Sequence, residues 1–298
     1  MQPNTREATS SHTVRASVMV ALSACGFGAI AIFTLLATRD GATLQAVLLG
    51  RYAIASVALV LVAGGPRALR LARTKTFYLL AAGGLGQVLL TYCGLSALRY
   101  LPAATVSFIF YTYPLWVTVI EAATGAERLT RVRVGALLLA LAGLAIMVGS
   151  PFTGQLSLLG ILLALAAAVI YAIYIPVIGK LQVGVAPAVS AAWVAMGAGI
   201  IYLLVGALTR TITAPDSLTG WSAIVAMALF STVAAFILFL RGLATLGPVR
   251  TAIISTVEPF FTAILAALVL GQALMARTFA GGVLIVAAVT LINLSRSE

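Results

Sequence analysis

The sequence predicts an all-α integral membrane protein, with ten transmembrane helices arranged as two inverted five-helix repeats. Three observations lead to this prediction: the composition, the number of long apolar stretches, and an internal repeat. Hydrophobic residues make up 62% and charged residues 8% of the 298 positions, whereas soluble domains are about half apolar and about a quarter charged. Because so little of the chain is polar, we expect any function to lie within the membrane.

The apolar stretches set the number of spans. A helix needs roughly 17 to 25 apolar residues to cross about 30 Å of hydrocarbon. Ten stretches meet this length, near residues 14–38, 42–63, 76–98, 102–123, 132–149, 156–179, 186–208, 219–240, 248–270 and 278–294. They lack the alternating polarity of a membrane β-barrel. The first stretch is too long for a cleaved signal peptide, so we expect it to be retained.

The basic residues predict an orientation. Thirteen of the 18 Lys and Arg residues fall on one side of a ten-span topology and four on the other, while Arg51 lies inside a span. The positive-inside rule then predicts that both termini lie in the cytoplasm. We expect the membrane to be the plasma (bacterial inner) membrane. Because the basic residues are scattered among short connections without interleaved aromatics, nucleic acid is not an expected partner.

Residues for catalysis or metal binding are scarce. Cys25 and Cys93 both lie in apolar spans, and His12, the single histidine, lies in the polar tail. No metal site, Ser-His-Asp set or phosphate-binding loop can be assembled from the sequence. We therefore expect neither an enzyme nor a bound cofactor.

The internal repeat divides the chain into two halves. Three features recur at a separation of 145 or 146 residues, namely Pro102 with Pro248, Tyr113-Pro114 with Glu258-Pro259, and Glu127 with Gln272. The predicted units are a tail at 1–13, a first repeat at 14–149 and a second at 150–298. Each repeat has five spans, which is an odd number, so the second repeat must enter the membrane in the opposite orientation to the first. Inverted repeats are typical of secondary transporters, whose substrate site lies near the membrane centre.

These features resemble the ten-helix EamA-type members of the drug/metabolite transporter superfamily. The resemblance covers about residues 14 to 294 and is carried by the repeated prolines, by the Arg51-Tyr52 pair and by the Gly-x-Glu-like ends of the fourth and ninth spans. The family pattern has an acidic residue at the position of Gln272, so this sequence departs from the pattern there. The aromatic residues from Phe108 to Trp116 are similar to those of YddG-type exporters. The resemblance implies alternating access and export of small metabolites such as aromatic amino acids.

Polar residues inside the spans are the candidates for substrate binding, because they are costly in hydrocarbon. The fourth and ninth spans carry matching stripes, and the third and sixth carry shorter ones. The candidate set is Gln87, Thr91, Ser107, Tyr111, Tyr171, Tyr174, Thr251, Ser255 and Glu258. The alternative is that the hydroxyls bond to their own helices and that the tyrosines anchor the protein at the membrane interface.

Two charged and two proline residues stand near the middle of their spans. Arg51 and Glu258 are candidates for an intramembrane ion pair; alternatively, Glu258 binds a substrate amine or carries a coupling proton. Pro114 and Pro259 are expected to kink their helices. They act either as hinges or as static kinks.

Two other functions stay open at this point. One is exchange of phosphate-sugars or nucleotide-sugars, against which stands the near absence of intramembrane cations other than Arg51. The other is a non-catalytic membrane subunit. The expected partners are a small-molecule substrate and membrane lipid, with proton coupling possible. The sequence leaves the solute, the direction of flux and the oligomeric state open.

Overall fold

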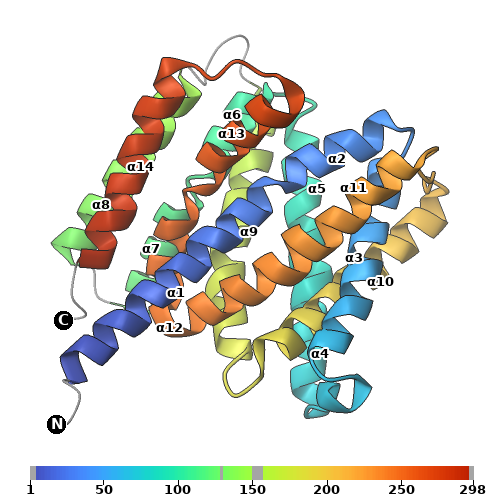
Figure 1. Ribbon diagram of the computed structural model, residues 1–298, viewed down its shortest axis with the longest axis horizontal. Helices are drawn as coiled ribbons and strands as arrows, with labels where there is room; N and C mark the ends of the chain where they lie inside the picture. Colours follow the sequence, from blue (N-terminus) through green and yellow to red (C-terminus); the bar gives the residue numbers. More distant parts are fainter. Residues whose placement is uncertain (1–4, 128–129, 150–156, 295–298) are drawn as a thin grey trace.

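The protein is described by a computed structural model that covers residues 5–127, 130–149 and 157–294. All regular structure in these ranges is helical (Figure 1). The elements are α1 (Thr5–Gly28), α2 (Ile30–Arg39), α3 (Leu44–Val62), η1 (Pro66–Leu69), α4 (Arg73–Ala81), η2 (Ala82–Gly86), α5 (Gln87–Ala97), α6 (Ala103–Phe110), α7 (Tyr113–Ala123), α8 (Arg131–Val148), α9 (Leu158–Leu181), α10 (Pro187–Thr209), α11 (Leu218–Ala228), η3 (Leu229–Ala234), α12 (Ala235–Ser255), α13 (Glu258–Leu270) and α14 (Ala276–Leu294).

The predicted spans are present, with corrections at several boundaries. In the described part of the chain, nine helical stretches are long and apolar enough to cross a membrane. One of them, Leu218–Ser255, joins the predicted eighth span to the first half of the ninth, and α13 supplies the other half. The backbone leaves the helical conformation at Gly247 (φ 77°, ψ 171°), which is where the eighth span ends. The tail, predicted at 1–13, is helical from Thr5.

The fourth and ninth spans are each broken into two helices. α6 ends at Phe110 and α7 starts at Tyr113, while α12 ends at Ser255 and α13 starts at Glu258. Pro114 and Pro259 therefore lie in the first turn of a new helix, where the missing N–H costs nothing. This differs from the expected kink within one continuous helix. The role of the two prolines as hinges stays a prediction.

The two repeats pack in matching pairs. The first span lies along the eighth (α1 with α12), and its repeat equivalent, the sixth, lies along the third (α9 with α5). The second packs on the seventh (α3 with α10) and the fifth on the tenth (α8 with α14, adjacent in Figure 1). A two-fold axis in the membrane plane produces this set of contacts, as expected for inverted repeats.

The two ends of the bundle differ in charge. We call one end the basic end: α1 begins and α14 ends there, and the connections 63–72 and 182–186 lie there (Figure 1). The connections 40–43, 98–102, 210–217 and 271–275 lie at the opposite end.

Connections of the two repeats are bonded to one another at both ends. At the basic end Trp193 Nε1 donates to the carbonyl of Leu69 over 3.2 Å, and Lys75 Nζ donates to that of Val183. At the opposite end the Asp40 carboxylate accepts from the backbone N–H of Ser217 (2.9 Å) and of Gly220 (3.2 Å), and from the Ser217 hydroxyl (2.7 Å). These bonds link the first repeat to the second.

Glycine allows the closest helix contacts. A Cβ built on Gly143 of α8 would lie 2.6 Å from the carbonyl oxygen of Gly281 on α14, and a Cβ on Gly281 would meet the Gly143 carbonyl. Gly83 and Gly197 bring the third and seventh spans equally close. Small residues at such crossings let backbones approach in a bilayer, where helix association depends on close packing.

We predict that Gly143→Ala destabilises the protein. The added methyl group forces α8 and α14 apart, an overpacking effect of about 1–3 kcal/mol. Thermal unfolding in detergent measures it as a lower melting temperature. Gly94→Ala is the matched control, because no atom lies within 4 Å of a Cβ at Gly94. An unchanged melting temperature for Gly143→Ala would contradict the packing described above.

We also predict that Asp40→Asn loosens the bonded connections at the opposite end. Bonds from Ser217 lower the pKa of the Asp40 carboxyl, so the folded state favours its charged form. The stabilisation is therefore present above the ordinary pKa of aspartate and is lost as the pH falls through the lowered value. Hydrogen exchange of residues 217–221 should be faster in Asp40→Asn at pH 7. In acid, where Asp40 is protonated, the exchange rates of these residues in the wild type should approach those in the variant.

The control for this experiment is Asp216→Asn. Asp216 lies in the same connection and is exposed, and its side chain makes no hydrogen bond or ion pair within the described residues. Equal exchange rates in wild type and Asp40→Asn at pH 7 would refute the role given to Asp40.

Candidate functional site

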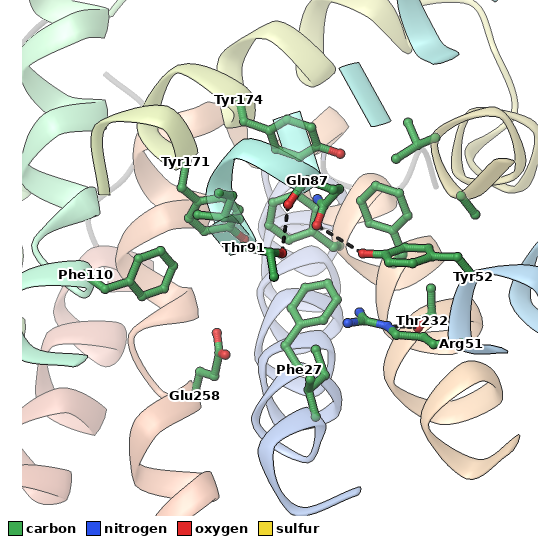
Figure 2. Close-up of a pocket in the computed structure, with 16 residues that line it drawn as sticks. Phe27, Arg51, Tyr52, Gln87, Thr91, Phe110, Tyr171, Tyr174, Thr232 and Glu258 are labelled. Atoms are coloured by element: carbon green, nitrogen blue, oxygen red, sulfur yellow. Dashed lines mark hydrogen bonds between the residues drawn. The ribbon is translucent and has the colours of Figure 1, made fainter. Parts of the chain in front are cut away.

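A cavity of about 190 Å³ lies in the middle of the bundle (Figure 2). Every predicted span except the fifth and tenth contributes to its wall. The lining residues are Phe27, Ile30, Arg51, Tyr52, Gln87, Leu90, Thr91, Phe110, Tyr171, Tyr174, Val194, Ala195, Thr232, Phe236, Phe239 and Glu258. We call it the central cavity.

Equivalent positions of the two repeats face each other across this cavity. Gln87 and Thr232 are separated by the repeat offset of 145 residues, and Phe27 and Tyr171 by 144. The side chains at equivalent positions differ in chemistry. The cavity is therefore symmetric in its backbone and asymmetric in its polar groups.

Irregular helix segments place several of these side chains. The π-helical segments η2 and η3 occupy matching places in the third and eighth spans. Gln87 directly follows η2, and Thr232 lies within η3. Such π segments are often found at functional sites.

The helix breaks position two further lining residues. Phe110 is the last residue of α6, and Glu258 is the first residue of α13. Glu258 is thereby held at the start of α13, in the wall of the central cavity. The hydroxyl of Tyr111, which lies in the matching break of the other repeat, also interacts with the Glu258 carboxyl.

Arg51 brings a positive charge to the cavity. Its side chain is buried, its Nε donates to Thr232 Oγ1 over 2.7 Å, and its guanidinium lies 4.9 Å from the centre of the Tyr52 ring. Within the described residues its terminal Nη groups have no hydrogen-bond partner. The head group is thus fixed in place with two donor nitrogens unused.

The expected ion pair between Arg51 and Glu258 is absent from the described structure. The two residues lie on different walls of the cavity, with the Phe27 ring between them in Figure 2. Arg51 is bonded to Thr232 instead, and Glu258 interacts with Tyr111. Both charges therefore remain available to a bound molecule.

The remaining wall is aromatic. Tyr171 stacks on Tyr174 at 6.2 Å and on Phe110 at 5.7 Å between ring centres, and Phe27 meets Phe239 edge-on at 5.9 Å. The Tyr52 hydroxyl donates to Gln87 Oε1 over 3.2 Å. An aromatic wall of this kind suits a flat apolar group.

The predicted site residues fall into two groups. Gln87, Thr91, Arg51, Tyr171, Tyr174 and Glu258 line the central cavity. Ser107, Tyr111, Thr251 and Ser255 do not line it. Ser107 is exposed, Tyr111 reaches the cavity only through Glu258, and Thr251 and Ser255 are buried outside it. The helix breaks change which face of the fourth and ninth spans points inward, so a stripe drawn along one continuous helix is wrong there.

Sequence reasoning missed the aromatic residues Phe27, Phe236 and Phe239, and also Thr232. Nothing in a membrane helix separates a cavity-lining phenylalanine from one that faces lipid. The sequence did contain a signal for Thr232: it lies 145 residues after the candidate Gln87, so it occupies the equivalent position in the second repeat. In the described residues no group of His, Cys, Asp and Glu side chains could hold a metal ion.

Comparisons with known proteins agree with this architecture. A solved structure titled "Crystal structure of protein" has the same fold, with a TM-score of 0.78 over 95% of this chain and 99% of its own, at 21% identity. No curated protein matches. The model of the EamA-like transporter family matches twice, at residues 14–149 and 158–294. The chain therefore belongs to the EamA-like transporter family, a family of multi-pass membrane transporters within the drug/metabolite transporter superfamily.

Proposed function

We propose that this protein is a secondary exporter of small neutral amino acids, aromatic ones in particular, which works by alternating access through the central cavity. One observation carries the proposal. Where the two repeats meet, the described wall of the cavity holds one cation, Arg51, and one carboxylate, Glu258, which form no ion pair with each other and lie on different walls with the Phe27 ring between them in Figure 2.

This arrangement matches the charges of a free amino acid. The unused Nη donors of Arg51 suit a carboxylate, which guanidinium binds with two parallel hydrogen bonds. Glu258 suits the ammonium group, with Tyr111 supporting its carboxyl. The rings of Phe110, Tyr171 and Phe239 then contact the amino-acid side chain.

The same charges disfavour phosphate-sugars and nucleotide-sugars. A phosphate ester carries close to two negative charges at neutral pH, and Arg51 is the one basic residue among the described residues that line the cavity. Glu258 would repel such a ligand. A non-catalytic subunit would have no need for two unpaired charges at the membrane centre, because buried unpaired charges are destabilising.

The proposed setting is the bacterial inner membrane, with the basic end and both termini in the cytoplasm. The support is the excess of Lys and Arg at the basic end. Glu258 is the proposed carrier of any coupled proton. The reaction requires neither a cofactor nor catalysis.

Transport by the purified protein in liposomes tests the proposal. We expect phenylalanine to move, and both phenethylamine and 3-phenylpropionate, which each lack one charged group, to move poorly. Arg51→Gln and Glu258→Gln should each reduce phenylalanine transport roughly tenfold or more, because each removes a charge-assisted hydrogen bond of about 1.5–3 kcal/mol. Parallel runs with a pH gradient show whether a proton is coupled.

The control variant is Arg99→Gln, which removes an exposed cation at the opposite end of the bundle. The charge assignment also predicts a crossed selectivity. Arg51→Gln should lose its preference for phenylalanine over phenethylamine, and Glu258→Gln its preference over 3-phenylpropionate. Failure of every neutral amino acid to move, or full activity in both variants, would refute the proposal.

A further inference from the structure

A second cavity, of about 550 Å³, lies at the basic end. It is bounded by the end of α7, by the connection between α9 and α10, and by α12 near its break at Gly247. The lining residues are Glu121, Pro176, Gly179, Lys180, Gln182, Val183, Gly184, Val185, Pro187, Leu243, Ala244 and Pro248. We call it the basic-end cavity.

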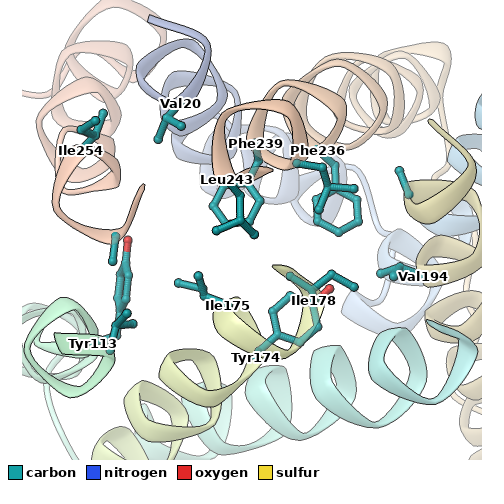
Figure 3. Packing of buried hydrophobic residues seen from close by; sticks show 14 of the residues in the cluster. Val20, Tyr113, Tyr174, Ile175, Ile178, Val194, Phe236, Phe239, Leu243 and Ile254 are labelled. Atoms are coloured by element: carbon teal, nitrogen blue, oxygen red, sulfur yellow. The ribbon is translucent and has the colours of Figure 1, made fainter. Parts of the chain in front are cut away.

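An apolar layer separates the two cavities. Along α9, Tyr171 and Tyr174 line the central cavity and Gly179 and Lys180 line the basic-end cavity. Between them lies the apolar layer, whose members are at most 3% exposed and belong to one buried cluster: Tyr113, Ile175, Ile178, Leu240, Leu243 and Val249 (Figure 3 labels four of them). The structure is therefore closed between the central cavity and the basic end.

Glu121 is the unusual residue of the basic-end cavity. It lies in the last turn of α7, lines the cavity and is only 4% exposed. In the part of the chain that the structure describes, its carboxylate has no hydrogen bond and no ion pair. A buried carboxylate without a partner is destabilising, so its presence calls for a ligand.

The neighbouring carboxylate behaves differently. Glu127 forms an ion pair with Arg133 over 3.0 Å and does not line the cavity. Glu127 thus has an ion-pair partner, whereas Glu121 has none among the described residues.

The other polar groups of this cavity define the ligand it would accept. Gln182 is buried; its Nε2 donates to the carbonyl of Leu240 over 3.1 Å, and its Oε1 has no partner among the described residues. Lys180 is exposed and its charge acts on Glu121, though these two described side chains form no ion pair. An ammonium group, with three N–H donors, complements the two unused acceptors, and Lys180 complements a carboxylate.

We propose that the basic-end cavity is a second binding site for amino acids, in which Glu121 binds the ammonium group and Lys180 the carboxylate. Substrate occupies this site before it passes the apolar layer to the central cavity. The proposal rests on the proposed function for its choice of ligand. It adds a site outside the central cavity, reached from the cytoplasm.

Equilibrium binding to the purified full-length protein tests the second site. We expect wild type to bind two equivalents of radiolabelled phenylalanine, and Glu121→Gln and Glu258→Gln to bind one each. Phenethylamine should compete at the site that Glu258→Gln retains. Asp216→Asn, a carboxylate-to-amide change remote from both cavities, should bind two. The proposal would be overturned if Glu121→Gln still bound two equivalents of phenylalanine with unchanged affinity. It would also be overturned if sodium, and not phenethylamine, competed with phenylalanine at the site that Glu258→Gln retains.

Sided transport gives a second measurement. In proteoliposomes, Glu121→Gln should raise by about tenfold the concentration of phenethylamine that half-inhibits phenylalanine transport when it is added at the basic end. The value for phenethylamine added at the opposite end should not change. Lys180→Gln should leave both values unchanged, because phenethylamine has no carboxylate. An equal effect at both ends would indicate a general structural defect and overturn the proposal.

The two proposals fail separately. In one outcome, phenylalanine is not transported, but phenethylamine still binds to Glu258→Gln and no longer binds to Glu121→Gln. The basic-end site then stands and the exporter function is wrong. If phenylalanine moves and Glu121→Gln matches wild type in both assays, the exporter function stands and the second site is wrong.

Discussion

The architecture follows from one constraint: in hydrocarbon every backbone N–H and C=O group must be satisfied within the protein. The chain is therefore helical wherever it meets lipid. Non-helical backbone at membrane depth is tolerated only where protein or a cavity surrounds it. The breaks at Tyr111–Thr112 and Thr256–Val257 obey this rule, because both lie beside the central cavity and not on the outer surface. The constraint that makes the protein helical thus also indicates where its site can be.

Duplication explains why the site has its composition. Because the repeats are inverted, equivalent positions such as Gln87 and Thr232 both line the central cavity. Once the two sequences diverged, one half could supply Arg51 and the other Glu258. A cavity with a symmetric backbone thereby acquired a basic group on one wall and an acidic group on another. An amino acid with its two opposite charges would therefore bind in a single orientation.

If the two proposals hold, both cavities select the substrate. Among the described residues that line them, each cavity has one carboxylate and one cation that form no ion pair with each other. The buried apolar layer between the cavities would have to open before a charged group could pass. Because the layer is tightly packed, we expect it to be either closed or open, with few intermediate states. Pro176, which lies inside α9, and the backbone break at Gly247 border the layer on its basic-end side, where the helices are least regular.

The sequence by itself determined the membrane class, the helical fold and the two inverted repeats, because hydropathy, charge asymmetry and repeated prolines are local or periodic signals. It also selected Gln87, Thr91, Tyr171, Tyr174, Glu258 and Arg51, since polar residues in apolar spans are conspicuous. Only the tertiary structure decided that Arg51 bonds Thr232 and leaves Glu258 unpaired, that Ser107 faces outward, and that Glu121 lines a second cavity. The reason is physical: helix breaks and π segments rotate one face of a span against the next, and that rotation depends on contacts between distant segments.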